Sequence, residues 1–330
     1  MKKLCCCLLM LILIAASQTA SAWDSVGHRL ATSIALSLLG DEKKAQLLNI
    51  LRQHPRFQQD FIDAMPSTLA QADDANRLQW LLGQASYWPD LARRLPAQER
   101  EEFNRPPWHF IDGAWLRDAA QSQGNVYLDI DSFAAINGEP AAAIRSPAQI
   151  HNVMTALDFN TRLLANSETS PAIRAVALCW VLHLMADIHQ PLHAGSLYSE
   201  KLFPQGDRGG NGIATDDGNL HARWDRALTG EGLAFHLQAF LQTPSVNRSS
   251  TISPEKSDWS LWLNESREIL HRQVYSRAIR REITAAQIQD RRMNSIPLDS
   301  AYVQQMQSSA TRRIQLAGLR LANWFTNEMP

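Results

Sequence analysis

The chain has 330 residues, of which 45% are hydrophobic and 20% are charged, and its formal net charge is −1. This length is sufficient for one sizeable hydrophobic core or two smaller ones. The near-neutral charge excludes a protein that captures nucleic acid at long range through a strongly basic surface, so any anionic substrate has to be held locally.

Residues 1–22 have the features of a secretory signal peptide. Two lysines come first, an apolar run follows, and the segment ends in Ala-Ser-Ala, which fits the pattern of signal peptidase sites. We predict cleavage between Ala22 and Trp23, which would leave 23–330 as one exported domain, periplasmic or secreted. Cleavage would change the formal charge from −1 to −3. No later apolar run is long enough to span a bilayer, so we expect no membrane anchor after processing.

Cysteine usage argues against a disulfide framework. After residue 22 the chain contains a single cysteine, Cys179, so the mature protein cannot form an internal disulfide even where export would permit one. Its stability must come from a hydrophobic core, helped by any bound metal.

The spacing of apolar residues is helical along most of the chain. It predicts helices over Gly27–Leu39, Asp41–Arg52, Met65–Trp80, Pro147–Ala165, Pro171–Asp187, Trp259–Ile279, Thr284–Arg291 and Ser300–Asn327. No convincing strand pattern is present. Residues 196–219, rich in Gly and Asp, predict a long surface loop, and residues 123–146 a second irregular stretch. The sequence therefore predicts a single all-α domain.

Trp23 would carry a free α-amino group after cleavage. An α-amino group and its neighbouring carbonyl oxygen can chelate a cation, and the imidazole of His28 follows five residues later. Processing would then create a metal site. The alternative is that Trp23 only fills the core.

Histidine and aspartate residues concentrate in two later segments. His183 and Asp187 are four residues apart on one face of a predicted helix, where they can share a cation. His193 follows a proline that should end or kink that helix, so it would point elsewhere. His221 and Asp225 repeat the four-residue spacing. One such pair is more often a structural hydrogen bond, but together these residues exceed what one metal ion can use, and three zinc ions would account for them.

These motifs resemble those of the S1/P1 family of zinc-dependent nucleases over nearly the whole mature chain. The resemblance rests on Trp23 with His28, Trp88-Pro89-Asp90, His109-Phe110-Ile111-Asp112, the segment from His183 to His193, Gly209-Gly210-Asn211, and the segment from Asn219 to Asp225. It implies an all-α, single mainly helical domain of the type shared with bacterial zinc phospholipase C, and a cofactor of three zinc ions.

The resemblance also implies which residues hold each ion. Asp90, His109, His183 and Asp187 would hold one zinc ion; the backbone of Trp23, with His28 and Asp187, would hold a close neighbour; His193, His221 and Asp225 would hold the third. Asp187 would bridge the close pair. His189 matches no ligand position and is left out.

Four further residues receive roles by the same resemblance. Asp112 would orient the attacking hydroxide, or else support a ligand histidine. Arg93 would face the scissile phosphate, where a guanidinium can form paired hydrogen bonds, unless it is a solvated surface residue. Phe110 would stack on an unpaired base, or else belong to the core. Asn211 would contact the edge of a base.

The function implied is that of an exported endonuclease that cuts single-stranded DNA and RNA and leaves 5′-phosphates, with 3′-nucleotides as further substrates. We expect a monomer. A zinc-dependent phospholipase C is the first alternative, although the last ligand here is Asp225 rather than a glutamate. An inactive, zinc-stabilised binding protein is the second, and it would leave Asp112 and Arg93 without a task.

Overall fold

The computed structural model describes residues 23–111, 114–116, 152–242 and 257–330. Its α-helices are α1 (Ser25–Leu38), α2 (Asp41–Leu51), α3 (Ser67–Ala70), α4 (Asp74–Ala92), α5 (Ala97–Phe103), α8 (Val153–Ala165), α9 (Pro171–Asp187), α10 (Leu220–Asp225), α11 (Gly232–Gln242), α13 (Trp259–Ile269), α14 (Arg277–Ile288) and α15 (Ser300–Asn327). Single helical turns of other types are η1 (Gln58–Ile62), η2 (Pro106–His109), η5 (Pro191–His193) and η6 (Leu270–Val274). The strands are β1 (Ala114–Leu116), β2 (Ser196–Leu197), β3 (Ala214–Thr215) and β4 (Gly218–Asn219).

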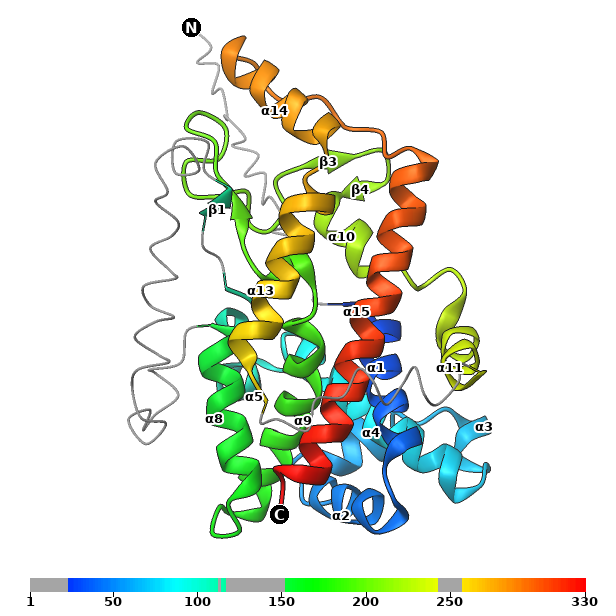
Figure 1. The fold of residues 1–330 in the computed structure, drawn as a ribbon. Coiled ribbons are helices and arrows are strands. Elements are labelled where there is room, and N and C mark those ends of the chain that lie inside the picture. The colour runs from blue at the N-terminus through cyan, green and yellow to red at the C-terminus, as the bar shows by residue number, and fades with distance from the viewer. Residues whose placement is uncertain (1–22, 112–113, 117–151, 243–256) are drawn as a thin grey trace, which may run out of the picture.

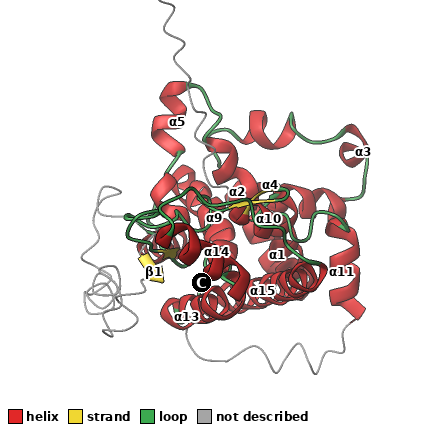
Figure 2. Cartoon of the chain, turned by 90° about the horizontal axis from the view of Figure 1, so that it is seen from above, coloured by secondary structure: helices red, strands yellow, loops and turns green. Residues whose placement is uncertain are grey.

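Helices make up nearly all of the regular structure, which confirms the expected mainly helical fold class (Figure 2). Helix α9 lies at the centre, and α8, α4, α2, α15 and α1 pack against it (Figure 1). Between Ala175 and Asp187 every side chain of α9 except that of Val176 is buried. A helix that is apolar on all sides is stable only when it is enclosed in this way. No described helix is both long and apolar enough to cross a membrane.

The start of α1 is fixed by a side-chain cap. Asp24 Oδ1 accepts the backbone N–H groups of Val26 and Gly27 at 3.0 and 3.1 Å. These donors have no partner inside the helix, so an aspartate at this position stabilises the first turn. The cap places Trp23 directly before the helix that carries His28.

Helix α15 approaches α1 closely at Gly318. A Cβ atom at Gly318 would lie 2.6 Å from Ile34 Cβ and 2.7 Å from the carbonyl oxygen of Ala31. Protein interiors are close-packed, so no side chain fits there unless the two helices separate.

We expect the Gly318→Ala substitution to lower the free energy of unfolding by about 1–3 kcal/mol, because the added methyl group forces α15 away from α1. Urea unfolding of the purified variant measures the change. Gly40→Ala is the matched control, since nothing lies within 4 Å of a Cβ atom at Gly40. Wild-type stability of Gly318→Ala would contradict the close helix contact.

The core consists of two hydrophobic clusters that meet at the end of α9. One cluster contains Trp180 and Met185 and is built mainly from α2, α4, α8 and α9. The other contains Trp224 and Ala186 and is built mainly from α1, α10, α14 and α15. Met185 and Ala186 are neighbours in the chain but belong to different clusters. Asp187 therefore follows at the boundary between the two clusters.

The expectation of no strands and of a surface loop at 196–219 is wrong in detail. Strands β1 and β2 pair in parallel, and β3 and β4 form a short hairpin. Within 196–219, Ser196, Asp207 and Ile213 are almost completely buried. The carboxylate of Asp207 accepts hydrogen bonds from the hydroxyl of Tyr275, at 2.8 Å, and from the backbone N–H of Leu197. These bonds offset the cost of burying the carboxylate. A Gly- and Asp-rich composition indicates turns but does not show whether the turns are covered.

Several helix boundaries also differ from those expected. Helix α4 begins and ends later than the predicted Met65–Trp80, and Pro89 lies inside its last turn. The predicted helix 259–279 instead ends with η6, and Ser276 caps a new helix by accepting the N–H of Ile279. Helices α5 and α11 were not expected from the sequence. The predicted signal peptide, the stretch 123–146 and residues 147–151 lie outside the described residues.

Candidate metal centre

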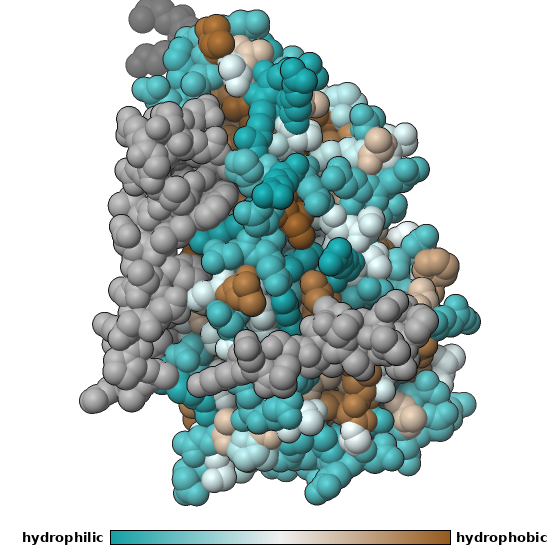
Figure 3. All heavy atoms as spheres, in the orientation of Figure 1, coloured by the Kyte–Doolittle hydropathy of each residue, from teal (hydrophilic) through white to brown (hydrophobic). Residues whose placement is uncertain are grey.

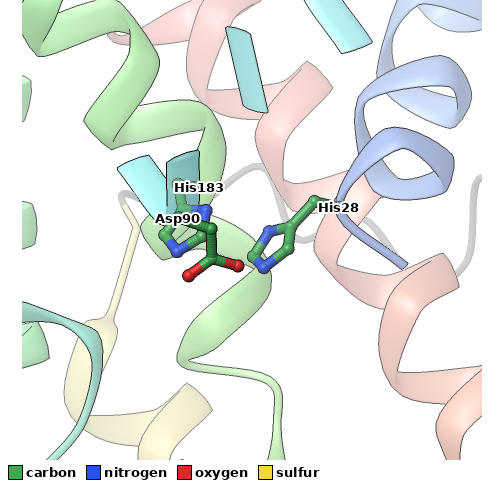
Figure 4. Close-up of side chains that lie close together, drawn as sticks. All are labelled: His28, Asp90 and His183. Carbon is green, nitrogen blue, oxygen red and sulfur yellow. The ribbon is translucent and has the colours of Figure 1, made fainter. Parts of the chain in front are cut away.

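Three helices bring His28, Asp90 and His183 together. Figure 4 shows the three side chains converging from α1, α4 and α9. One potential ligand atom from each lies within 4.8 Å of the others, and all three residues are buried. The rings of His28 and His183 stack with their centroids 3.9 Å apart.

A second group consists of His109, His183 and Asp187. His109 Nδ1 lies 2.8 Å from His183 Nε2. Asp187 Oδ2 is 3.2 Å from His109 Nδ1 and 3.1 Å from His183 Nε2. Two nitrogen atoms and one carboxylate oxygen thus face a common point, which is the ligand chemistry that zinc favours.

Asp187 faces both groups. Its Oδ2 atom belongs to the group just described, and its Oδ1 atom lies 3.5 Å from His28 Nε2. The two oxygen atoms of one carboxylate are therefore directed at different sets of histidines. This is the geometry that a bridging ligand requires.

The third group consists of His193, His221 and Asp225, also buried and also within 4.8 Å. The Nε2 atoms of the two histidines are 3.2 Å apart, and His221 Nε2 is 3.4 Å from Asp225 Oδ2. Gln190 donates a hydrogen bond to Asp225 Oδ1 at 2.7 Å. The amide of Gln190 therefore leaves Oδ2 as the oxygen atom nearer the histidines.

Backbone carbonyl groups orient the rings of three histidines. Nδ1 of His183, His193 and His221 lies 2.8, 2.7 and 2.6 Å from the carbonyl oxygens of Ser86, His109 and Gly209, respectively. We assign the proton to Nδ1 in each ring, which leaves Nε2 as the ligand atom. Gly209 has φ +57°, and a Cβ atom there would lie 2.3 Å from the carbonyl oxygen of Leu192. Only glycine therefore allows this carbonyl group to face His221.

Unpaired buried atoms indicate that the described side chains alone do not complete the centre. Both ring nitrogens of His28 and Asp187 Oδ1 are buried without a hydrogen-bond partner. Leaving such atoms unsatisfied is costly, and a cation held between His28 Nε2 and Asp187 Oδ1 would satisfy these two.

Burial and neighbouring groups shift the pKa values of His28 and Asp225. Burial lowers the pKa of His28 well below its ordinary value, and the charge of His183 lowers it further, so the ring stays neutral and able to bind metal. Burial raises the pKa of Asp225 well above its ordinary value, with Gln190 opposing. A cation beside Asp225 would reverse that direction by stabilising the carboxylate.

Helices α13 and α15 hold the turn between Asp187 and His193. Ser266, Arg313 and Arg267 donate hydrogen bonds to the carbonyl oxygens of Ile188, His189 and Ala194 at 2.6, 3.1 and 2.9 Å, respectively. All three donors are buried. The sequence analysis missed them, although Arg313 interrupts the buried apolar face of α15, which is a signal for a buried polar contact.

His189 has a structural role in the same region. Its Nδ1 atom lies 2.7 Å from the carbonyl oxygen of Met185, and its Nε2 atom lies 2.8 Å from Arg320 Nη1. Both ring nitrogens therefore contact atoms outside the three histidine–aspartate groups.

Trp23 lies at the edge of the centre. Its side chain is completely buried, and its indole N–H donates to the carbonyl oxygen of Ala186 at 3.1 Å. The next N–H, that of Asp24, donates to the carbonyl oxygen of Asp225 at 3.2 Å. The backbone at Trp23 is thereby held between the residue before Asp187 and the helix that carries Asp225.

The remaining expected site residues are placed as follows. Arg93 pairs with Asp90, and its side chain is 20% exposed. Phe110 is half-buried and follows His109 directly. Asn211 donates a hydrogen bond to the carbonyl oxygen of Arg208 at 2.8 Å, within its own turn. Asp112 lies outside the described residues.

The fold and this centre together define a mainly helical protein equipped to bind metal ions. The family model S1/P1 Nuclease matches residues 23–329. The chain therefore belongs to the S1/P1 nuclease family and is a nuclease, a hydrolase of phosphodiester bonds.

Two relatives illustrate the range of the family. Nuclease S1 of Aspergillus oryzae is 26% identical over 322 residues, which are 94% of this chain and 93% of the relative. Endonuclease 3 of Arabidopsis thaliana is 23% identical over 230 residues, which are 67% of this chain and 60% of the relative. The first of these similarities covers nearly the whole length of both chains.

Proposed function

We propose that this chain is an exported endonuclease that uses three zinc ions to hydrolyse single-stranded DNA and RNA, leaving 5′-phosphates. We also propose that it removes 3′-phosphates from nucleotides. The observation that carries the proposal is the presence of three buried histidine–aspartate groups, two of which Asp187 faces, in a chain of this family.

The donor set supports zinc as the metal. Neutral imidazole nitrogens and carboxylate oxygens suit zinc. The three groups consist only of histidine and aspartate residues. When bound, zinc supplies the Lewis acidity that polarises a phosphoryl oxygen and activates water near neutral pH. The proposed ligands are Trp23 through its backbone, His28, Asp90, His109, His183, Asp187, His193, His221 and Asp225.

The proposed substrate contacts lie around these ligands. Arg93, beside Asp90, would hold a phosphate oxygen, and Asp112 would orient the attacking water. Phe110 would receive an unpaired base by stacking, which is a contact that duplex DNA cannot offer without unpairing. Asn211 would contact the base edge. We further propose that residues 1–22 are removed during export and that the mature protein is a monomer.

The test is phosphodiesterase activity of the processed protein before chelation, after chelation and after zinc is restored. Single-stranded RNA, single-stranded DNA and a 3′-mononucleotide serve as substrates, with phosphatidylcholine alongside. We expect cleavage of the nucleic acids to be lost on chelation and to return with zinc, with 5′-phosphate on the products. Cleavage of the lipid alone would instead assign a phospholipase, and unchanged nucleic-acid cleavage after complete metal removal would contradict the zinc site.

A further inference from the structure

An open groove lies at the end of the molecule formed by η6 and α14. Its volume is about 850 Å³, which is in the range of about 300–1,000 Å³ found for pockets that hold small ligands. Figure 1 shows α14 at the same end as β3, β4 and α10. The groove belongs to none of the three histidine–aspartate groups, yet it lies at the end of the molecule that contains two of their ligands, His221 and Asp225.

The lining of the groove is strongly cationic. It contains Arg272, Arg277, Arg280 and Arg281, together with His271, and no acidic residue. Residues 270–292 hold six arginines against two acids, a net charge of +4 within a chain whose formal charge is −1. The overall charge therefore conceals one locally basic surface.

The nearby acids neutralise only part of this surface, because Glu268 pairs with Arg272 at 2.9 Å. Glu282 pairs with Arg291, which is outside the groove, and Asp290 pairs with Lys201. No carboxylate of the described residues forms an ion pair with Arg277 or Arg281. Both arginines are exposed, so their charges face solvent and whatever enters the groove.

One guanidinium is held in place by the backbone. Arg280 donates to the carbonyl oxygens of Tyr275 and His271 at 2.8 and 2.6 Å. An arginine fixed in this way loses less conformational entropy when an anion binds. Burial, followed by the charge of Arg280, lowers the pKa of His271, so this imidazole is kept neutral beside the arginines.

The groove also contains one exposed apolar side chain, that of Ile288. Arg277, Arg281, Thr284 and Ile288 follow the spacing of one helix face. The side chain of Ile288 is 76% exposed. Figure 3 shows one face of the molecule, which is mainly hydrophilic with scattered hydrophobic residues. A cationic groove is the surface that follows the phosphates of a single strand.

A short chain of contacts connects the groove to the candidate metal centre. Tyr275, at the floor of the groove, donates its hydroxyl to Asp207. Two residues later, the carbonyl oxygen of Gly209 accepts the Nδ1–H of His221. The floor of the groove and a proposed ligand are therefore held by the same buried turn.

We propose that this groove binds the phosphates of a single-stranded nucleic acid to one side of the bond that is cut. The inference rests on the proposed function and adds a second contact region for long substrates. A substrate with only one phosphate, at the scissile bond, does not reach the groove.

The test compares a long single strand with a dinucleotide that has a single phosphate. We expect the double variant Arg277→Ala and Arg281→Ala to raise KM for the long strand about tenfold at low salt, because two exposed charge contacts are lost. The dependence of log KM on log salt should become shallower by about 1.4, which is the value for two phosphates of a single strand. Both kinetic parameters for the dinucleotide should stay at the wild-type value.

Two matched variants separate the groove from net charge and from folding. Arg52→Ala with Arg100→Ala removes the same charge from exposed positions, at the C-cap of α2 and on α5, and it should leave the long-strand KM unchanged. Arg277→Lys with Arg281→Lys should keep most of the wild-type salt dependence, since lysine retains the charge. An equal loss in the control pair, an equal loss on the dinucleotide, or no change in the first pair would each overturn the proposal. Failure of the wild-type protein to cleave either substrate would instead overturn the proposed function.

Discussion

Replacing Asp187 with asparagine is expected to lower kcat/KM on single-stranded RNA by more than about 100-fold. Substitution of a residue that only orients a metal ligand lowers activity by up to about 100-fold. Asp187 faces the histidines with both carboxylate oxygens, so a larger loss is expected. An amide can present only one oxygen atom and carries no charge. The purified variant should therefore contain less zinc per chain, which elemental analysis measures beside the kinetics.

Asp158→Asn is the matched control for this prediction. Asp158 pairs with Arg162 on α8, away from the three histidine–aspartate groups, so its replacement should change neither zinc content nor kcat/KM. A normal zinc content and normal kinetics in Asp187→Asn would exclude a bridging role for this carboxylate.

A protein that retains one or more residues before Trp23 is expected to lose activity to a similar extent. The added residue converts the free α-amino group into an amide, which is a poor metal ligand at neutral pH. It also has to fit where Trp23 is completely buried and where Asp24 is fixed to the carbonyl oxygen of Asp225. Mass spectrometry identifies the N-terminus of each preparation, and zinc content and kcat/KM are compared between preparations.

The control for this prediction carries the same residues after Pro330. That residue is exposed and lies at the far end of α15, so the extension should leave activity unchanged. Full activity and full zinc content in a protein with a verified extension before Trp23 would rule out a ligand role for its α-amino group.

Helical periodicity was sufficient to predict the local part of the centre. His183 with Asp187, and His221 with Asp225, are each one helical turn apart, and the structure places both pairs as the spacing implies. The convergence of these pairs with residues far away in the chain is a tertiary property. Only the family resemblance suggested it, because spacing within one helix says nothing about which helices are neighbours.

The end of α4 shows where local reasoning fails. Pro89 lacks an N–H group and is expected to interrupt a helix, yet here it lies in the last turn of α4 and Asp90 follows it. The cost is acceptable at this position because the turn is fixed by tertiary contacts: the carbonyl group of Ser86 bonds to His183, and Trp88 is buried. Such compensation is visible only in the folded chain.

The residues that position the ligands were the least predictable. Gln190, Gly209 and Arg313 act through hydrogen bonds to ligands or to the turn that carries them. Gln190 and Gly209 lie inside segments that resemble the family, but their sequence does not show which hydrogen bond each one makes. Burial lowers the pKa of Arg313 to about 10, which reflects the cost of placing a guanidinium in the core, where it donates to the carbonyl oxygens of His189 and Trp262 and pairs with Glu265.

The boundary between the two hydrophobic clusters has a consequence for the amount of folded protein. The proposed ligands come from residues on both sides of that boundary, so bound zinc would link the two halves of the core. Each tenfold rise in free zinc above the dissociation constant of a site would add about 1.4 kcal/mol to the stability of the native state. Without a disulfide among the described residues, the native chain would depend on zinc supply for its resistance to proteases. Scarcity of the metal would then limit the amount of enzyme as well as its activity.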